Sequence, residues 1–207
     1  MSAAAVTSSN AALEWHAASV PAPGETALGD WAVVTFADGR AIAAAVDGLG
    51  HGAQAAAAAE AAASVLERSA GKEPAAIVLD CHRALRETRG AALSVASIDL
   101  REHELTWLGV GNVEARLLHG AEPVPPAESL LLHAGIVGHE LPRLSVQTLR
   151  IARGDVLLFG TDGIRREFAD SLELSGSCRE IAERTIQQYA LGSDDALVLA
   201  VRYLARG

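Results

Sequence analysis

Three aspartates stand where apolar, strand-like runs of the sequence begin or end. Asp47 closes one run, Asp162 closes a second, and Asp194 stands just before the last run. A strand carries its side chains to a defined edge of a sheet, so these carboxylates can converge although they are far apart in sequence. Converging carboxylates need a counter-charge, and Mg²⁺ and Mn²⁺ are hard cations that prefer oxygen ligands. The pattern indicates metal-assisted phosphate chemistry.

An Asp-Gly pair is by itself mainly a turn signal, so the context of each aspartate has to be weighed. Asp38 and its glycine lie between two apolar runs and predict a hairpin turn. Asp47 differs because a Gly-Leu-Gly-His-Gly segment follows it and leads into a helix, and glycines let backbone approach a ligand. Asp194 and Asp195 are adjacent acids at a strand start, which is unfavourable unless they are solvated or coordinated. This context favours a functional role for Asp47, Asp162 and Asp194.

The overall charge argues against one large class of partners. The formal net charge is −9, and sequence-independent binding of nucleic acid relies on Lys and Arg. We therefore expect no nucleic-acid partner. The same charge repels a phosphorylated substrate, so positive charge has to be supplied locally, and a bound metal would supply it.

The length of 207 residues fits a single domain over residues 1–207, with residues 1–10 flexible. The two cysteines, Cys81 and Cys178, lack the Cys-x-x-Cys spacing of zinc or redox sites, which fits a reducing cytoplasm. The sequence has neither a signal-peptide pattern nor an apolar stretch of about 18 residues, so we expect no export and no membrane partner.

Strand patterns occur in consecutive groups that are separated by helical patterns, which indicates an α+β fold with mostly antiparallel sheets. We interpret this as two packed sheets with helices outside them. The expected helices are 51–70, 74–89 and 178–189. The expected strands are 13–20, 31–36, 40–46, 91–100, 105–110, 114–119, 129–133, 144–151, 155–160 and 196–203.

Four segments resemble the metal-dependent protein phosphatases of the type 2C (PPM) family. The resemblance is strongest to the bacterial branch that contains the RsbX, RsbU and sporulation stage II E phosphatases, and most of all to the RsbX type. The segments are 46–52 (VDGLGHG), 109–112 (GVGN), 154–163 (GDVLLFGTDG) and 193–199 (SDDALVL). They occur in the family's order and span most of the chain. The resemblance implies a four-layer αββα sandwich of two mostly antiparallel β-sheets flanked by helices.

The resemblance also implies a centre of two divalent cations, Mn²⁺ or Mg²⁺. Asp47 would bridge both metals, and the Gly48 carbonyl would hold one of them. Asp162 and Asp194 would hold the other, and Asp30 lies near the place of a further acidic residue of the family. Asp195 occupies a position where many relatives have Asn, so it would support the site, although it could exchange roles with Asp194.

Two departures from the family pattern concern a proton donor and a third metal. Enzymes outside this branch have a histidine two residues after the first aspartate, whereas here Leu49 stands there and the histidine is His51. His51 is therefore either a proton donor to the leaving oxygen or a residue at a helix start without catalytic work. Asn112 stands where others have an acid that helps to bind a third metal, and a neutral amide is a poorer cation ligand.

The function implied by the resemblance is hydrolysis of phosphoserine and phosphothreonine in proteins. The substrates would be phosphorylated STAS-domain proteins and their stressosome scaffold, and the enzyme would reset stress signalling by negative feedback. Two alternatives remain open. The substrate could instead be a free anti-anti-sigma factor, or the chain could be a pseudophosphatase adaptor that binds phosphoproteins without turnover.

Overall fold

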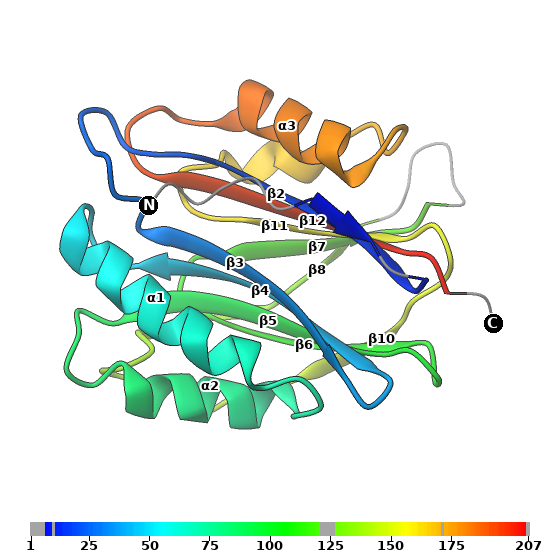
Figure 1. Ribbon diagram of the computed structural model, residues 1–207, viewed down its shortest axis with the longest axis horizontal. Coiled ribbons are helices and arrows are strands. Elements are labelled where there is room, and N and C mark those ends of the chain that lie inside the picture. The colour runs from blue at the N-terminus through cyan, green and yellow to red at the C-terminus, as the bar shows by residue number, and fades with distance from the viewer. Residues whose placement is uncertain (1–6, 10, 121–126, 171, 206–207) are drawn as a thin grey trace.

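A computed structural model describes residues 7–9, 11–120, 127–170 and 172–205. Two six-stranded sheets lie face to face, with helices on both outer sides (Figure 1). The first sheet has the order β1 (Thr7–Ser9), β2 (Leu13–Val20), β12 (Ala196–Tyr203), β11 (Val156–Gly160), β7 (Glu114–Leu118) and β8 (Ala127–Ser129). The second has the order β10 (Gln147–Arg150), β6 (Glu104–Val110), β5 (Ala91–Asp99), β4 (Arg40–Gly48) and β3 (Asp30–Ala37), and β9 (Leu132–His133) pairs with β6.

The helices complete a four-layer arrangement. The helices α1 (Ala53–Glu67) and α2 (Pro74–Ala84) cover the outer face of the second sheet, and α3 (Cys178–Tyr189) covers the first sheet together with a short 3₁₀ helix, η1 (Arg166–Ala169) (Figure 1). Strand neighbours are antiparallel except in the β6–β9 pair. The predicted αββα sandwich of mostly antiparallel sheets is confirmed.

Three apolar clusters hold these layers together. One lies between the two sheets and includes Trp107 and Phe159, a second joins α1 and α2 to the second sheet, and a third joins α3 to the first sheet. In the second cluster, the side of α1 that faces the sheet is almost entirely alanine: Ala58, Ala59, Ala62 and Ala63 are buried there, followed by Leu66. Small side chains let the helix lie close to the sheet, and this brings the start of α1 near the end of β4.

The hairpin between β3 and β4 sets the register that the site depends on. Asp38 has φ 54° and Gly39 has φ 80°, the pair of positive values that a two-residue hairpin turn requires. The turn role predicted for Asp38 is confirmed. From this turn the pairing runs without interruption to Asp30 and Asp47, which face each other across the two strands.

Most predicted elements form close to their expected bounds, and the main differences concern one helix and two strands. The helix expected over 74–89 ends at Ala84, after which residues 85–87 form a turn. The strand expected over 144–151 is reduced to β10, and the strand expected over 129–133 is divided between β8 and β9. Of the expected flexible segment 1–10, residues 1–6 and 10 lie outside the described residues, whereas Thr7–Ser9 pairs with β2. No described helix is both long and apolar enough to cross a bilayer.

Candidate active site

The ends of four strands bring the predicted aspartates to one end of the sandwich. Asp30 begins β3 and Asp47 lies opposite it near the end of β4. In the other sheet, β11 and β12 are antiparallel neighbours, so Asp162, just after β11, and Asp194, just before β12, emerge together. This end is the left side of Figure 1, where α1 also begins.

The electrostatics of the group show that these carboxylates influence one another. The pKa of Asp47 is raised to about 7. Burial is the largest cause, and the charges of Asp162, Asp194 and Asp195 also contribute to this rise. Burial, followed by the charge of Asp47, holds the pKa of Asp30 well above its ordinary value. Burial and the charge of Asp194 also raise the pKa of Asp162. Acid groups have therefore been gathered where their negative charge is unfavourable.

The chemistry of this group fits a hard divalent cation. Every donor is a carboxylate oxygen, and none of the charged groups that shift these three pKa values is a Lys or Arg. A divalent cation supplies the missing positive charge and prefers this type of ligand. In the described part of the chain, no three His, Cys, Asp or Glu side chains are already arranged so that they could hold a metal ion.

Two neutral side chains position members of the group. The Asn112 amide donates to Asp162 Oδ2 at 2.7 Å, and its hydrogen bonding also lowers the pKa of Asp47, which opposes the larger effect of burial. The Thr161 hydroxyl donates to Asp30 Oδ2 at 2.7 Å inside the protein and accepts from the Leu197 N–H at 2.9 Å. Asn112 thus lies among the carboxylates without adding negative charge to them.

Asp194 and Asp195 have different environments. Asp195 is 4% exposed, and its two carboxylate oxygens accept the backbone N–H groups of Ala22 and Gly29, each at 2.7 Å. Asp194 is exposed, and its Oδ1 accepts the N–H of Asp195 at 2.8 Å. Asp195 therefore ties the loop between β2 and β3 to the start of β12, whereas Asp194 Oδ2 has no hydrogen bond to any residue that the structure describes.

Two glycines allow the backbone to pack tightly at this end. A Cβ on Gly48 would lie 2.2 Å from the carbonyl oxygen of Ala55, and one on Gly163 would lie 2.0 Å from the carbonyl oxygen of Asp195. Both distances are shorter than any real contact of that kind. The glycine after each of Asp47 and Asp162 is therefore required by close backbone packing.

His51 lies in the loop between β4 and α1, and its side chain is 70% exposed. Its Nδ1 lies 2.8 Å from Glu25 Oε1, so the loop between β2 and β3 orients the imidazole. The Glu25 carboxylate also lies close to Gly52, because a Cβ on Gly52 would be 3.3 Å from Glu25 Oε2. His51 is thus beside the carboxylate group in sequence, and a partner holds it in place.

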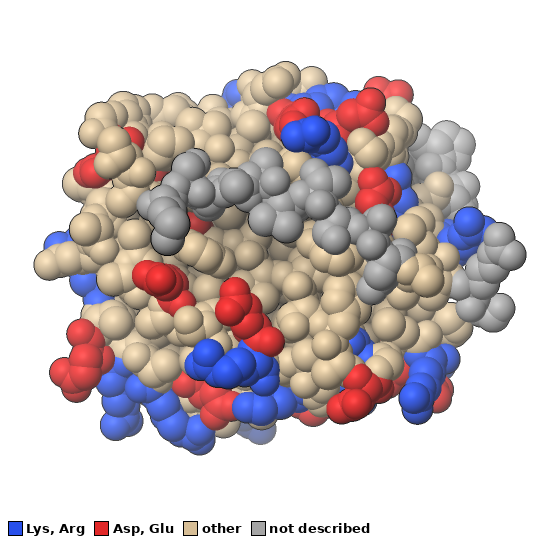
Figure 2. Space-filling model, viewed as in Figure 1, with Lys and Arg blue, Asp and Glu red and all other residues tan. Residues whose placement is uncertain are grey.

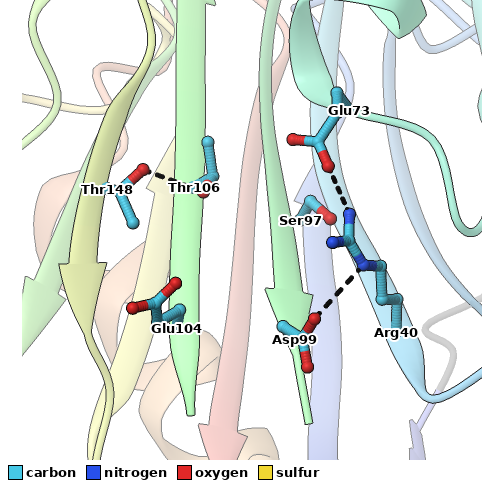
Figure 3. Close-up of a pocket in the computed structure, with 7 residues that line it drawn as sticks. All are labelled: Arg40, Glu73, Ser97, Asp99, Glu104, Thr106 and Thr148. Atoms are coloured by element: carbon cyan, nitrogen blue, oxygen red, sulfur yellow. Dashed lines mark hydrogen bonds and ion pairs between the residues drawn. The ribbon is translucent and has the colours of Figure 1, made fainter. Parts of the chain in front are cut away.

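A polar pocket of about 190 Å³ opens elsewhere on the second sheet (Figure 3). Within it Arg40 pairs with Glu73 and, at 3.3 Å, with Asp99. Asp47 lies seven residues along β4 from Arg40, which at about 3.3 Å per residue places Arg40 roughly 23 Å from Asp47. Arg40, Glu73 and Asp99 are paired within the pocket, Glu104 pairs with Arg150 outside it, and the pocket is not the candidate active site. It is lined by Arg40, Glu73, Ser97, Asp99, Glu104, Thr106 and Thr148.

Three supporting residues were not predicted from the sequence. Thr161 directly precedes Asp162 and could have been singled out as part of the same segment. Glu25 lies in an irregular loop without a recognisable pattern, and the part of Asn112 as a donor to Asp162 appears only when the two sheets are in place.

Comparisons with known proteins agree with this geometry. Residues 37–204 match the family model of stage II sporulation protein E (SpoIIE). The phosphoserine phosphatase RsbX of Bacillus subtilis (strain 168) is 26% identical over 184 residues, which are 88% of this chain and 90% of RsbX.

Solved structures extend the similarity to the whole fold. A chain from a study of the bacterial stressosome, a modular system adapted to control secondary messenger signalling, has a TM-score of 0.83 and 29% identity, covering 92% of this chain and 99% of that one. The crystal structure of RsbX in complex with magnesium has a TM-score of 0.84 and 21% identity, and the match covers 96% of this chain and 99% of the RsbX chain.

The two-sheet sandwich with aspartates at its strand ends defines the class of metal-dependent phosphoprotein phosphatases of type 2C. Within this class, the chain belongs to the SpoIIE family. The resemblance to that branch, and to RsbX within it, is confirmed.

The different environments of Asp194 and Asp195 lead to a stability prediction for the chelator-treated protein. Asp195→Asn replaces one acceptor oxygen by a donor and leaves a buried N–H without a partner, so we expect a loss of about 1–3 kcal/mol in the free energy of unfolding by urea. Asp194→Asn should change it by less than about 0.5 kcal/mol. Relief of repulsion towards Asp47 occurs in both variants and largely cancels in the comparison. Equal effects of the two changes would contradict the structural part assigned to Asp195.

Proposed function

We propose that this protein is a phosphoserine and phosphothreonine protein phosphatase that requires two divalent cations, Mn²⁺ or Mg²⁺. Its substrates are phosphorylated STAS-domain proteins and their stressosome scaffold, and by removing phosphate it resets stress signalling in the cytoplasm. The observation that carries this proposal is the group of aspartates at the strand ends, where burial and mutual repulsion raise the pKa values of Asp30, Asp47 and Asp162 and a bound cation would offset the negative charge.

The resemblance to type 2C phosphatases suggests the metal ligands, and the placement of these residues at one end of the sandwich supports this choice. Asp47 would be a ligand of both cations, and the Gly48 carbonyl would hold one of them. Asp162 and the exposed Asp194 would hold the other, with Asp30 as a further acidic residue opposite Asp47. Bound cations supply a nucleophile that is active at neutral pH and neutralise charge on the phosphoryl oxygens.

The chain's own residues organise the rest of the site. Asn112 holds Asp162 in place, and Thr161 does the same for Asp30. His51, oriented by Glu25, donates a proton to the leaving seryl or threonyl oxygen. The neutral Asn112 favours two cations over three.

The similarities support the choice of substrate. RsbX, which shares 26% identity over most of both chains, is named as a phosphoserine phosphatase, and the 29% identical chain comes from work on the stressosome. Neither of the alternatives, a free anti-anti-sigma factor as substrate or a pseudophosphatase, gains a specific observation. The retained aspartates favour turnover over binding alone.

The decisive activity test uses Asp47→Asn. This change removes the central negative charge, so we expect the Mn²⁺-dependent hydrolysis of an aryl phosphate and of a phosphorylated STAS protein to fall by about 100-fold or more. The fold should be kept, because the change relieves repulsion within the site. Asp38→Asn is the matched control, since Asn tolerates the left-handed turn conformation there, and it should retain activity.

The same assay separates the substrates. Phosphorylated scaffold STAS proteins and a phosphorylated free anti-anti-sigma factor are compared with Mn²⁺, with Mg²⁺ and with chelator, and the scaffold protein should be turned over faster. Full activity of Asp47→Asn, or activity that survives the chelator, would contradict the proposed site. Metal binding without any hydrolysis would favour the pseudophosphatase.

The part assigned to His51 is tested by the leaving group. An aryl phosphate expels a stable phenolate and needs little protonation, whereas phosphoserine expels a poor alkoxide leaving group. His51→Ala should therefore lower kcat for phosphoserine by about 100-fold or more and change kcat for the aryl phosphate much less. An unchanged pH–rate profile on phosphoserine would show that His51 is not the proton donor.

A further inference from the structure

Arg89 lies in the loop between α2 and β5, at the same end of the sandwich as the aspartates. In the pairing of β4 with β5, Gly48 faces Ala91 and Asp47 faces Ala92. Arg89 is only two residues before Ala91. The chain therefore carries a guanidinium group to the rim of the candidate active site.

The arginine side chain lies directly against the loop that follows Asp47. A Cβ on Gly50, which has φ 84°, would lie 2.7 Å from Arg89 Nη1. The Leu49 N–H donates to the Gly90 carbonyl oxygen at 3.0 Å, so the two loops are joined next to the contact. The 136–140 turn also packs closely against Gly90, since a Cβ on Gly90 would lie 2.6 Å from the side chain of Ile136. The Arg89 guanidinium therefore lies against the loop that follows Asp47, and the backbone next to Arg89 is fixed by packing on two other segments.

The charge of Arg89 has no partner within the described part of the chain. Its side chain is exposed, and no hydrogen bond or ion pair joins it to another described residue. Arg83, on α2, differs in that it pairs with Asp80 at 2.6 Å. Figure 2 shows basic side chains gathered near the C-terminal end of α2, although the net charge of the chain is −9.

Arg89 forms no ion pair with any described aspartate, so it leaves their carboxylates free for cations. An anionic substrate that approaches the aspartates meets this cation first, and a guanidinium presents a planar pair of donors that matches two phosphoryl oxygens.

We propose that Arg89 binds the phosphoryl group of the substrate at the rim of the active site. This inference rests on the proposed phosphatase function and adds a residue that orients the phosphate by charge-assisted hydrogen bonds. The missing side chain of Gly50 leaves room for the guanidinium at this place.

The test measures phosphate binding separately from turnover. Arg89→Ala should raise the inhibition constant of inorganic phosphate and the KM for an aryl phosphate by about tenfold, which corresponds to ~1.4 kcal/mol. The kcat should change less, and the midpoint of thermal unfolding should stay the same. Arg89→Lys should recover part of the effect, because it keeps the charge but not the paired donors. Arg86→Ala, which removes an exposed arginine three residues earlier, is the control and should leave both constants unchanged.

Three results would overturn the proposal. The first is an inhibition constant for phosphate that stays within about twofold of the wild-type value in Arg89→Ala. The second is a higher KM for the phosphoprotein alone, since this would mean that Arg89 contacts the protein and not its phosphate. The third is an equal effect of Arg86→Ala. If the wild-type protein neither hydrolyses nor binds phosphate, the proposed function fails as well, and this outcome is distinct from the other three.

Discussion

Mutual repulsion among carboxylates at one end of the sandwich is the constraint on which the rest of the structure depends. Burial and neighbouring charges raise the pKa of Asp47 to about 7 and hold that of Asp30 well above its ordinary value. Such a group costs stability unless protons or cations neutralise it. A fold that keeps it has to hold the aspartates in place by strong constraints elsewhere.

The fold supplies these constraints through backbone geometry. The β3–β4 register places Asp30 opposite Asp47, and the antiparallel β11–β12 pair brings Asp162 and Asp194 together from the other sheet. The buried Asp195 accepts two backbone N–H groups and ties a loop to this end. The cores between the four layers then fix one sheet relative to the other. The proposed active site lies where this rigid framework ends, and Arg89 lies in a loop at the same end.

Much of this arrangement could be predicted because it is encoded locally. Strand-end aspartates next to glycines indicated the site, and the two-residue turn at Asp38 was recognisable from its flanking strands. A supporting role for Asp195 was expected, but its partners were not, because its two N–H donors, on Ala22 and Gly29, are 173 and 166 residues away. The contacts of Glu25 with His51 and of Arg89 with Gly50 likewise arise between loops, where no periodicity marks the partners. The 144–151 strand was predicted too long because an apolar pattern does not show where a pairing partner ends.

The central claim is that this carboxylate group requires a cation, and the pH dependence of stability tests it most directly. In the folded, chelator-treated protein the pKa of Asp47 is raised from 3.8 to about 7, so the folded state binds more protons than the unfolded state between these values. The free energy of unfolding should therefore fall as pH rises from about 5 to 8, relative to Asp47→Asn measured alongside, and Mn²⁺ should restore it increasingly towards pH 8. Equal pH dependence in the two proteins, or no stabilisation by Mn²⁺, would contradict the account.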